Sequence, residues 1–137
     1  MKNFFLDTNI VIDVLIDRKP FSDDGKIIFE NGINKKIKLY ISALSYATIY
    51  YYIKKSTSSH EKTMLILNKL NSFIETTDVN NTTIKNALNS NFKDFEDAIQ
   101  YHSAKNKSID AIITRNSKDF KNSSLLILTP DEALAIL

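Results

Sequence analysis

Short apolar segments recur along this chain, and longer segments with a helical pattern separate them. Two of the short segments, "AIIT" at 111–114 and "LLIL" at 125–128, are continuously apolar. Such strands are typical of a sheet that helices cover on both faces. Because parallel strands are joined by crossover helices, the alternation predicts an α/β fold, a three-layer α/β/α arrangement with a central parallel β-sheet.

The boundaries of these elements follow from the same pattern. We expect strands at 3–7, 38–42, 73–77, 111–114 and 125–128. We expect helices at 10–16, 22–36, 43–55, 58–72, 81–90, 94–106 and from 130 onward. No repeat, linker or low-complexity segment divides the chain, so residues 1–137 are expected to form a single domain.

The second helix has a clear predicted start. Pro20 disfavours continuation of the first helix, and Ser22 is expected to cap the second. In that helix Ile27, Ile28 and Ile33 are expected to face inward.

Two further helix starts carry capping residues. Ser58 and Glu61 have the spacing of a capping box. Thr129 is expected to cap the last helix, with Pro130 at its first position.

The composition limits the chemistry. The chain has no cysteine, which suits a cytoplasmic location, and its two histidines are not spaced as a pair of metal ligands. No apolar run approaches the ~20 residues that a membrane helix needs. The net charge of +2 is too small to indicate a nucleic-acid-binding protein by itself. Any catalysis is therefore expected to use carboxylates, hydroxyls and amides.

Polar residues stand at or just past the ends of several predicted strands: Asp7, Ser42 and Asn116. In open α/β sheets, ligands bind beyond the carboxyl ends of the strands. Asp7 is nevertheless open to two interpretations, a helix cap or a member of a metal site. Asp13 interrupts the apolar run "IVIDVLI" and is expected to point to solvent rather than to join a polar site.

The start of the helix at 94–106 is also acidic. Asp94 has the place of an N-cap, and Asp97 would be stabilised by the helix dipole in the first turn. Glu96, between them, is expected to face water. Ala98 and Ile99 indicate that the helix packs on the sheet, which would carry Asp97 inward.

A third polar group lies in "TRNSKDF" at 114–120. Asn116 and Asp119 offer oxygen ligands, although such residues also stabilise turns without any function. Arg115 is either a phosphate contact or a surface charge. If these segments converge at one edge of the sheet, several like charges would recruit a hard cation, and oxygen ligands without His or Cys select Mg²⁺ or Mn²⁺.

Four stretches together resemble the PIN domain family, and small prokaryotic members of the VapC toxin type in particular. They are "FFLDTNIVIDVL", "SALSYATIYYYIKK", "DFEDAIQYHSAKNKSIDAIITRNSKDF" and "LLILTPDEALAIL", and they span nearly the whole chain in the family's order. The resemblance implies a PIN-like fold and a metal-dependent ribonuclease that cuts single-stranded RNA.

The resemblance also implies roles for particular residues. Asp7, Asp97 and Asp119 would be catalytic residues and ligands of Mg²⁺ or Mn²⁺, with Asp94 as a neighbouring ligand. Asn116 would be a further catalytic residue. Thr114 and Asn116 would position water or phosphate.

The family's remaining acid is a Glu, and the matching position in this chain is Thr48. Threonine brings no negative charge, so the acidic cluster is weakened. An alternative is therefore a degenerate PIN domain that binds RNA or protein without catalysis. A phospho-acceptor domain fits less well, because no predicted middle strand ends in the aspartate that it needs.

Partners follow from the same resemblance. Arg115, Lys118 and the lysines at 54 and 55 are expected to contact RNA phosphates. A cognate antitoxin and a homodimer are expected partners, and no membrane is involved. The tyrosines at 50–52 are expected to divide between the core and its cover.

Overall fold

A computed structural model describes residues 1–121 and 123–137. Within these residues, parallel strands form a five-stranded sheet in the order β3-β2-β1-β4-β5. The strands are β1 (Lys2–Leu6), β2 (Ile37–Ser42), β3 (Ile74–Thr77), β4 (Ala111–Ile113) and β5 (Leu126–Leu128). All of them lie within one residue of the predicted boundaries.

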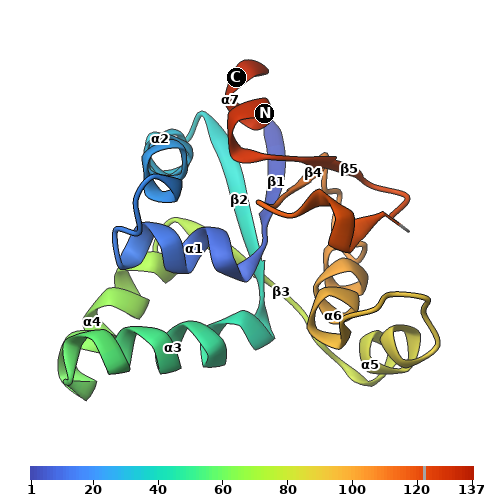
Figure 1. Ribbon diagram of the computed structural model, residues 1–137, viewed down its shortest axis with the longest axis horizontal. Helices are drawn as coiled ribbons and strands as arrows, with labels where there is room; N and C mark the ends of the chain where they lie inside the picture. Colours follow the sequence, from blue (N-terminus) through green and yellow to red (C-terminus); the bar gives the residue numbers. More distant parts are fainter. Residues whose placement is uncertain (122) are drawn as a thin grey trace.

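Helices cover both faces of this sheet (Figure 1). They are α1 (Thr8–Leu15), α2 (Phe21–Ile33), α3 (Ala43–Thr57), α4 (His60–Asn71), α5 (Asn81–Leu88), α6 (Phe95–Ala104), the short 3₁₀ helix η1 (Ser117–Phe120) and α7 (Pro130–Ala135). Helices α1 to α4 lie on one side, and α5 and α6 lie on the other (Figure 1). Along the described residues, no helix is both long enough and apolar enough to cross a bilayer. The predicted three-layer α/β/α arrangement with a central parallel sheet is confirmed.

The alternation of side chains along the strands builds two cores. Phe4 and Leu6 of β1 pack into the larger core, beneath α1 to α4. Phe5 points the other way, toward Tyr101 of α6 and Phe120 of η1. Because successive side chains of a strand point to opposite faces, a strand that is apolar throughout supplies both cores.

Helix α2 differs from its prediction. It begins one residue earlier, so Ser22 lies in its first turn, is buried and donates through Oγ to Asp17 Oδ1 at 2.8 Å. Ile28 is fully buried as predicted, but Ile27 and Ile33 are 45% and 54% exposed. The helix buries a narrow stripe, and only Ile28 of the three lies on it.

The predicted capping box at Ser58 and Glu61 is wrong by one residue. Ser58 ends α3 in a left-handed conformation, with φ of 54°. The N-cap of α4 is Ser59, whose side chain accepts a hydrogen bond from the backbone N–H of Lys62 at 3.1 Å.

Two other predicted helix starts are confirmed. Pro130 is the first residue of α7, and the backbone N–H of Thr129 donates to Glu132 Oε1 at 2.9 Å. Asp94 is the N-cap of α6 and accepts from the backbone N–H of Asp97 at 3.0 Å. This second cap fixes the first turn of α6 at the edge of the sheet where the candidate site lies.

Candidate functional site

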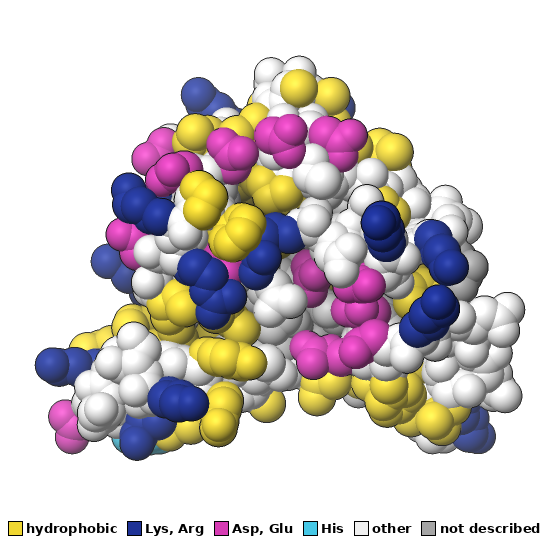
Figure 2. Space-filling view, in the orientation of Figure 1, with side chains coloured by type: hydrophobic (Ala, Val, Ile, Leu, Met, Phe, Trp, Pro, Cys, Tyr) yellow, Lys and Arg dark blue, Asp and Glu magenta, His cyan; other side chains and the backbone are white. Residues whose placement is uncertain are grey.

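The predicted acids meet in one pocket of about 310 Å³ beyond the carboxyl ends of β1 and β4. Five acidic residues line it: Asp7, Asp94, Glu96, Asp97 and Asp119. Six other residues complete the lining: Asn9, Thr48, Tyr52, Gln100, Arg115 and Asn116. Figure 2 shows acidic side chains gathered near the centre of this face. Residues from three separate parts of the sequence therefore come together as predicted.

Asp7 is held at the floor of this pocket. It follows β1 directly, and its backbone N–H donates to the carbonyl of Ile113 at the end of β4. This pairing puts Thr114 beside it, and the Thr114 hydroxyl donates to Asp7 Oδ2 at 2.8 Å. Gln100 Nε2 donates to Asp7 Oδ1 at 3.1 Å. Asp7 therefore has the N-cap position of α1, while its carboxylate is oriented by residues of two other segments.

Burial raises the pKa of Asp7, and the hydrogen bonds from Thr114 and Gln100 oppose that rise. Only 6% of the residue is exposed. Repulsion from the Asp119 carboxylate raises the pKa of Asp7 further. A negative charge at this position is therefore costly unless a cation arrives to balance it.

Gln100 is a residue of this candidate site that the sequence analysis missed. It is buried in α6, and its Oε1 accepts from the backbone N–H of Thr8 at 3.0 Å and from the Thr8 hydroxyl at 3.1 Å. The Thr8 hydroxyl also contacts the hydroxyl of Ser45, 2.7 Å away. Gln100 follows Asp97 by three residues, so the two share a face of the helix. A polar residue at that spacing in a buried stripe was the available signal.

Asp97 shows the strongest effect of the acidic surroundings. Burial, and then repulsion from Asp7, Asp94, Asp119 and Glu96, raises its pKa from the ordinary 3.8 to about 7. At neutral pH the side chain is thus poised between its protonated and ionised forms. A shift of this size at a concave site is a mark of function.

The prediction that Glu96 faces water is wrong. It lines the pocket and is half-buried, and burial together with repulsion from Asp7 and Asp94 raises its pKa. The dipole of α6 favours acids in its first turn, so two acids and a capping Asp94 can share this position. The pocket therefore contains one more acid than the sequence analysis assigned to it.

The turn after β4 contributes the other predicted residues. Asn116 and Asp119 are exposed and line the pocket. The backbone N–H of Asn116 donates to the Thr114 hydroxyl at 3.2 Å, which links the turn to the residue that orients Asp7. Thr114 itself is fully buried, and its hydroxyl is directed at the Asp7 carboxylate and not into the open pocket.

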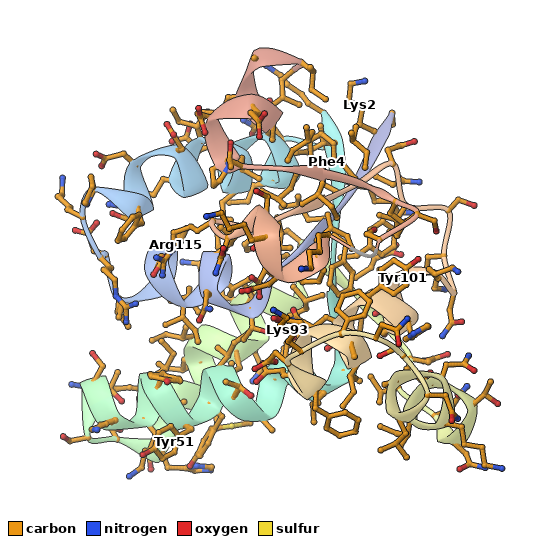
Figure 3. The ribbon with its side chains drawn as sticks, turned by 45° about the vertical axis from the view of Figure 1, so that its right-hand side comes forward. Lys2, Phe4, Tyr51, Lys93, Tyr101 and Arg115 are labelled. Atoms are coloured by element: carbon orange, nitrogen blue, oxygen red, sulfur yellow. The ribbon has the colours of Figure 1, made fainter. Side chains whose placement is uncertain are left out.

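The solvent-facing position predicted for Asp13 is wrong. This residue is 1% exposed, and its Oδ2 lies 2.6 Å from Nε of Arg115 and its Oδ1 3.4 Å from Nη1 of Arg18. Arg115 also lies over the ring of Phe21, 4.0 Å from its centroid. Figure 3 shows Arg115 against α1. Arg115 lines the acidic pocket, but its guanidinium is directed at Asp13.

The predicted basic and aromatic residues are divided among three places. Lys118 is exposed beside Asp119 in a small neighbouring hollow. Lys54 and Lys55 line a separate open hollow of about 460 Å³ with Tyr51, away from the acids. The tyrosines divide as predicted, because Tyr50 packs against the larger core while the two that follow it are exposed.

The donor set is suited to a hard divalent cation bound largely through water. Among the residues that the structure describes, no group of three or more acids or histidines is arranged to hold a metal ion, so the expected direct ligation by Asp7, Asp97, Asp119 and Asp94 together is wrong for this arrangement of side chains. Mg²⁺ usually keeps several waters and takes one or two protein carboxylates. Asp7 and Asp97 line the same pocket and would supply that number of ligands.

Comparisons with known proteins agree with this architecture. A family model for the PIN domain matches residues 3–118. Ribonuclease VapC1 of Aquifex aeolicus is 24% identical over 133 residues, which cover 93% of this chain and 90% of that protein.

Two solved structures also share the fold. A chain of VapBC2 from Rickettsia felis, bound to promoter DNA, has a TM-score of 0.67 and 20% identity, covering 93% of this chain and 98% of that chain. A toxin–antitoxin complex from Klebsiella pneumoniae has a TM-score of 0.66 and 23% identity, covering 92% and 96%.

The fold and the acid-lined edge thus define an α/β protein of the PIN type. The family model covers most of the chain, and the chain belongs to the PIN domain family. Thr48, at the position where the resemblance places a Glu, lines the same pocket as the acids.

Proposed function

We propose that this protein is a divalent-metal-dependent ribonuclease that cleaves single-stranded RNA. The observation that carries the proposal is the convergence of five acids on one pocket, with the pKa of Asp97 raised to about 7. Repulsion of this kind is relieved when a cation binds. The similarity to a ribonuclease of Aquifex aeolicus supports the same activity.

In this proposal Asp7 and Asp97 would hold Mg²⁺ or Mn²⁺ through one carboxylate each, and Asp94 and Asp119, which line the same pocket, would contact the ion's water shell. The ion, when bound, supplies a Lewis acid for phosphodiester hydrolysis and stabilises the charge that develops on phosphate. Gln100 and Thr114 keep the Asp7 carboxylate in one orientation. Asn116, exposed at the rim, would orient water or the phosphate with its side-chain amide.

Cleavage of an unstructured RNA in Mg²⁺ or Mn²⁺ tests the proposal. We expect Asp7→Asn and Asp97→Asn each to lower the rate about 100-fold or more, since electrostatic groups at a reacting centre contribute on that scale. Asp23→Asn is a matched control, because Asp23 is exposed on α2 and forms only a weak ion pair with Lys19. Equal cleavage by all of these proteins would attribute the activity to a contaminant and overturn the proposal.

A second candidate is a PIN domain that binds RNA without cutting it. Thr48 favours it, since the pocket lacks the Glu that the resemblance places there. This candidate predicts that RNA binds with no metal-dependent cleavage at any pH, and that Asp7→Asn leaves binding unchanged.

As a ribonuclease, the protein would serve as the toxin of a toxin–antitoxin pair. The structural relatives that are toxin–antitoxin complexes support this role. Expression of the chain should arrest growth, and a small antitoxin protein encoded beside it should relieve the arrest. A homodimer and a cytoplasmic location stay predictions.

A further inference from the structure

Three lysines border the acidic pocket on one side. A small hollow of about 40 Å³ is lined by Lys93, Lys118 and Lys121 together with three acids of the main pocket: Asp94, Asp97 and Asp119. The two hollows therefore share a wall of acids. Figure 2 shows basic side chains beside the acidic group, and Figure 3 shows Lys93 near the start of α6.

The charges of these three lysines have no ionic partner among the residues that the structure describes. All three residues are exposed. Arg115, the cation that lines the acidic pocket itself, differs from these lysines because it is paired with Asp13. The free positive charge at the rim therefore lies on the α6 side.

The backbone beneath the lysines is anchored to the core. Lys93 follows Phe92, and Lys121 follows Phe120, which is 1% exposed. The rings of Phe92 and Phe120 meet edge to face, with centroids 6.0 Å apart. This contact ties the segment before α6 to η1, so the lysines of both segments share one fixed platform.

A pocket of acids repels a polyanion, so a nucleic-acid strand needs cations close by to stay at the site. From this placement we propose that the phosphate backbone of the substrate RNA lies across Lys93, Lys118 and Lys121 and not across Arg115. The inference rests on the proposed ribonuclease function and assigns the side from which the strand reaches the acids. Contacts between lysine and phosphate are independent of sequence, and salt weakens them.

The test measures binding without cleavage, in the Asp7→Asn protein, by fluorescence anisotropy of a short unstructured RNA over a range of salt. The triple variant Lys93→Gln, Lys118→Gln, Lys121→Gln is compared with a control that removes the same charge elsewhere. That control is Lys2→Gln, Lys35→Gln, Lys36→Gln, three exposed lysines at the amino-terminal ends of β1 and β2.

Each phosphate contact contributes about 0.7 to the slope of log affinity against log salt for a single strand. We therefore expect the rim variant to reduce the magnitude of this slope by about 2 and to weaken binding about tenfold or more at low salt. The control should keep the slope of the parent. The same comparison with an intact Asp7, in EDTA, covers the case in which Asp7→Asn does not fold.

Equal slopes for the rim variant and the control would overturn the inference. Binding of poly-glutamate is measured in parallel. If the rim variant lost binding to poly-glutamate while its RNA binding stayed unchanged, the inference would also be overturned, since the three lysines would then form a protein-docking surface. Neither result depends on cleavage, so both leave the proposed function standing. Conversely, absence of metal-dependent cleavage by the wild type removes the proposed function while the slopes are still measured.

Discussion

Two buried carboxylates six residues apart in the sequence have opposite surroundings. Asp13 is 1% exposed and lies against two guanidinium groups, those of Arg115 and Arg18. Asp7 is 6% exposed and receives hydrogen bonds from the neutral side chains of Thr114 and Gln100. The first acid is balanced by charges of the fold, whereas the second is surrounded by other acids.

The difference shows how a fold separates a structural acid from one available to a ligand. A buried carboxylate that is paired with a cation inside the protein is already neutralised, so it does not need a cation from outside. A buried charge oriented only by neutral donors keeps its demand for a counter-ion. Arg115 marks the boundary, since it lines the acidic pocket while its charge is directed at Asp13.

The largest expected effect is the loss of stability that follows when the ion pair between Asp13 and Arg115 is broken. Arg115→Gln removes the closer partner of Asp13, which remains 2% exposed at its side chain and keeps only Arg18, 3.4 Å away. Removing one partner of a buried ion pair typically costs 3–5 kcal/mol, and the remaining Arg18 reduces this cost. We expect a loss of about 2 to 4 kcal/mol in the free energy of unfolding, measured by urea denaturation.

Arg18→Gln is the matched control for that experiment. The side chain of Arg18 is 42% exposed and its contact is longer, so its loss should cost about 1 kcal/mol or less. Equal losses from the two substitutions would show that Asp13 does not depend on Arg115, and the contrast with Asp7 would fail.

The next expected effect concerns the orientation of the Asp7 carboxylate. Gln100→Leu removes the N–H donor to Asp7 Oδ1 and the acceptor for the backbone N–H of Thr8. Residues that orient a metal ligand typically contribute ten- to hundredfold to affinity. We expect Mn²⁺ binding, followed by electron paramagnetic resonance titration without RNA, to weaken by about that factor.

Ser103→Ala serves as the comparison for Gln100→Leu. Ser103 is also a buried polar residue of α6, but its hydroxyl donates to the carbonyl of Asp78, away from the acids. This variant should lose stability while its affinity for Mn²⁺ stays unchanged. A similar loss of Mn²⁺ affinity in both variants would mean that Gln100 acts through general stability and not through Asp7.

These residues also show how far the sequence could lead. The parallel sheet was predictable because continuously apolar strands alternate with helices, and every strand lies within one residue of its expected range. Asp7, Asn116 and Asp97 could be assigned to one edge, since the ends of parallel strands and the starts of the following helices meet there. Asp94 as the cap of α6 followed from local chemistry alone.

The remaining features depend on contacts between distant residues. The partner of Asp13 lies 102 positions away, so its apolar surroundings in the sequence gave no sign of a buried ion pair. Glu96 was assigned to water from its place between two acids, whereas the orientation of the first turn of α6 brings it to the pocket. The direction in which a helix presents its first turn is set by packing, which local patterns do not specify.

The smallest expected effect is a gain in the free energy of unfolding, whereas Arg115→Gln is expected to lower it. The folded state binds the proton of Asp97 more tightly than the unfolded chain, because the pKa is raised from 3.8 to about 7. The stability that this proton contributes is present below pH 4 and is lost as the pH rises through 7. Asp97→Asn carries no such charge, so in EDTA at pH 8 it should be more stable than the wild type by about 1 to 2 kcal/mol. This figure is well below the full linkage value, since the side chain is partly solvated.

Urea denaturation at pH 4 should show no difference between Asp97→Asn and the wild type, and Mn²⁺ at pH 8 should stabilise the wild type alone. A gain that persists unchanged at pH 4 would show that repulsion among the acids is not its cause.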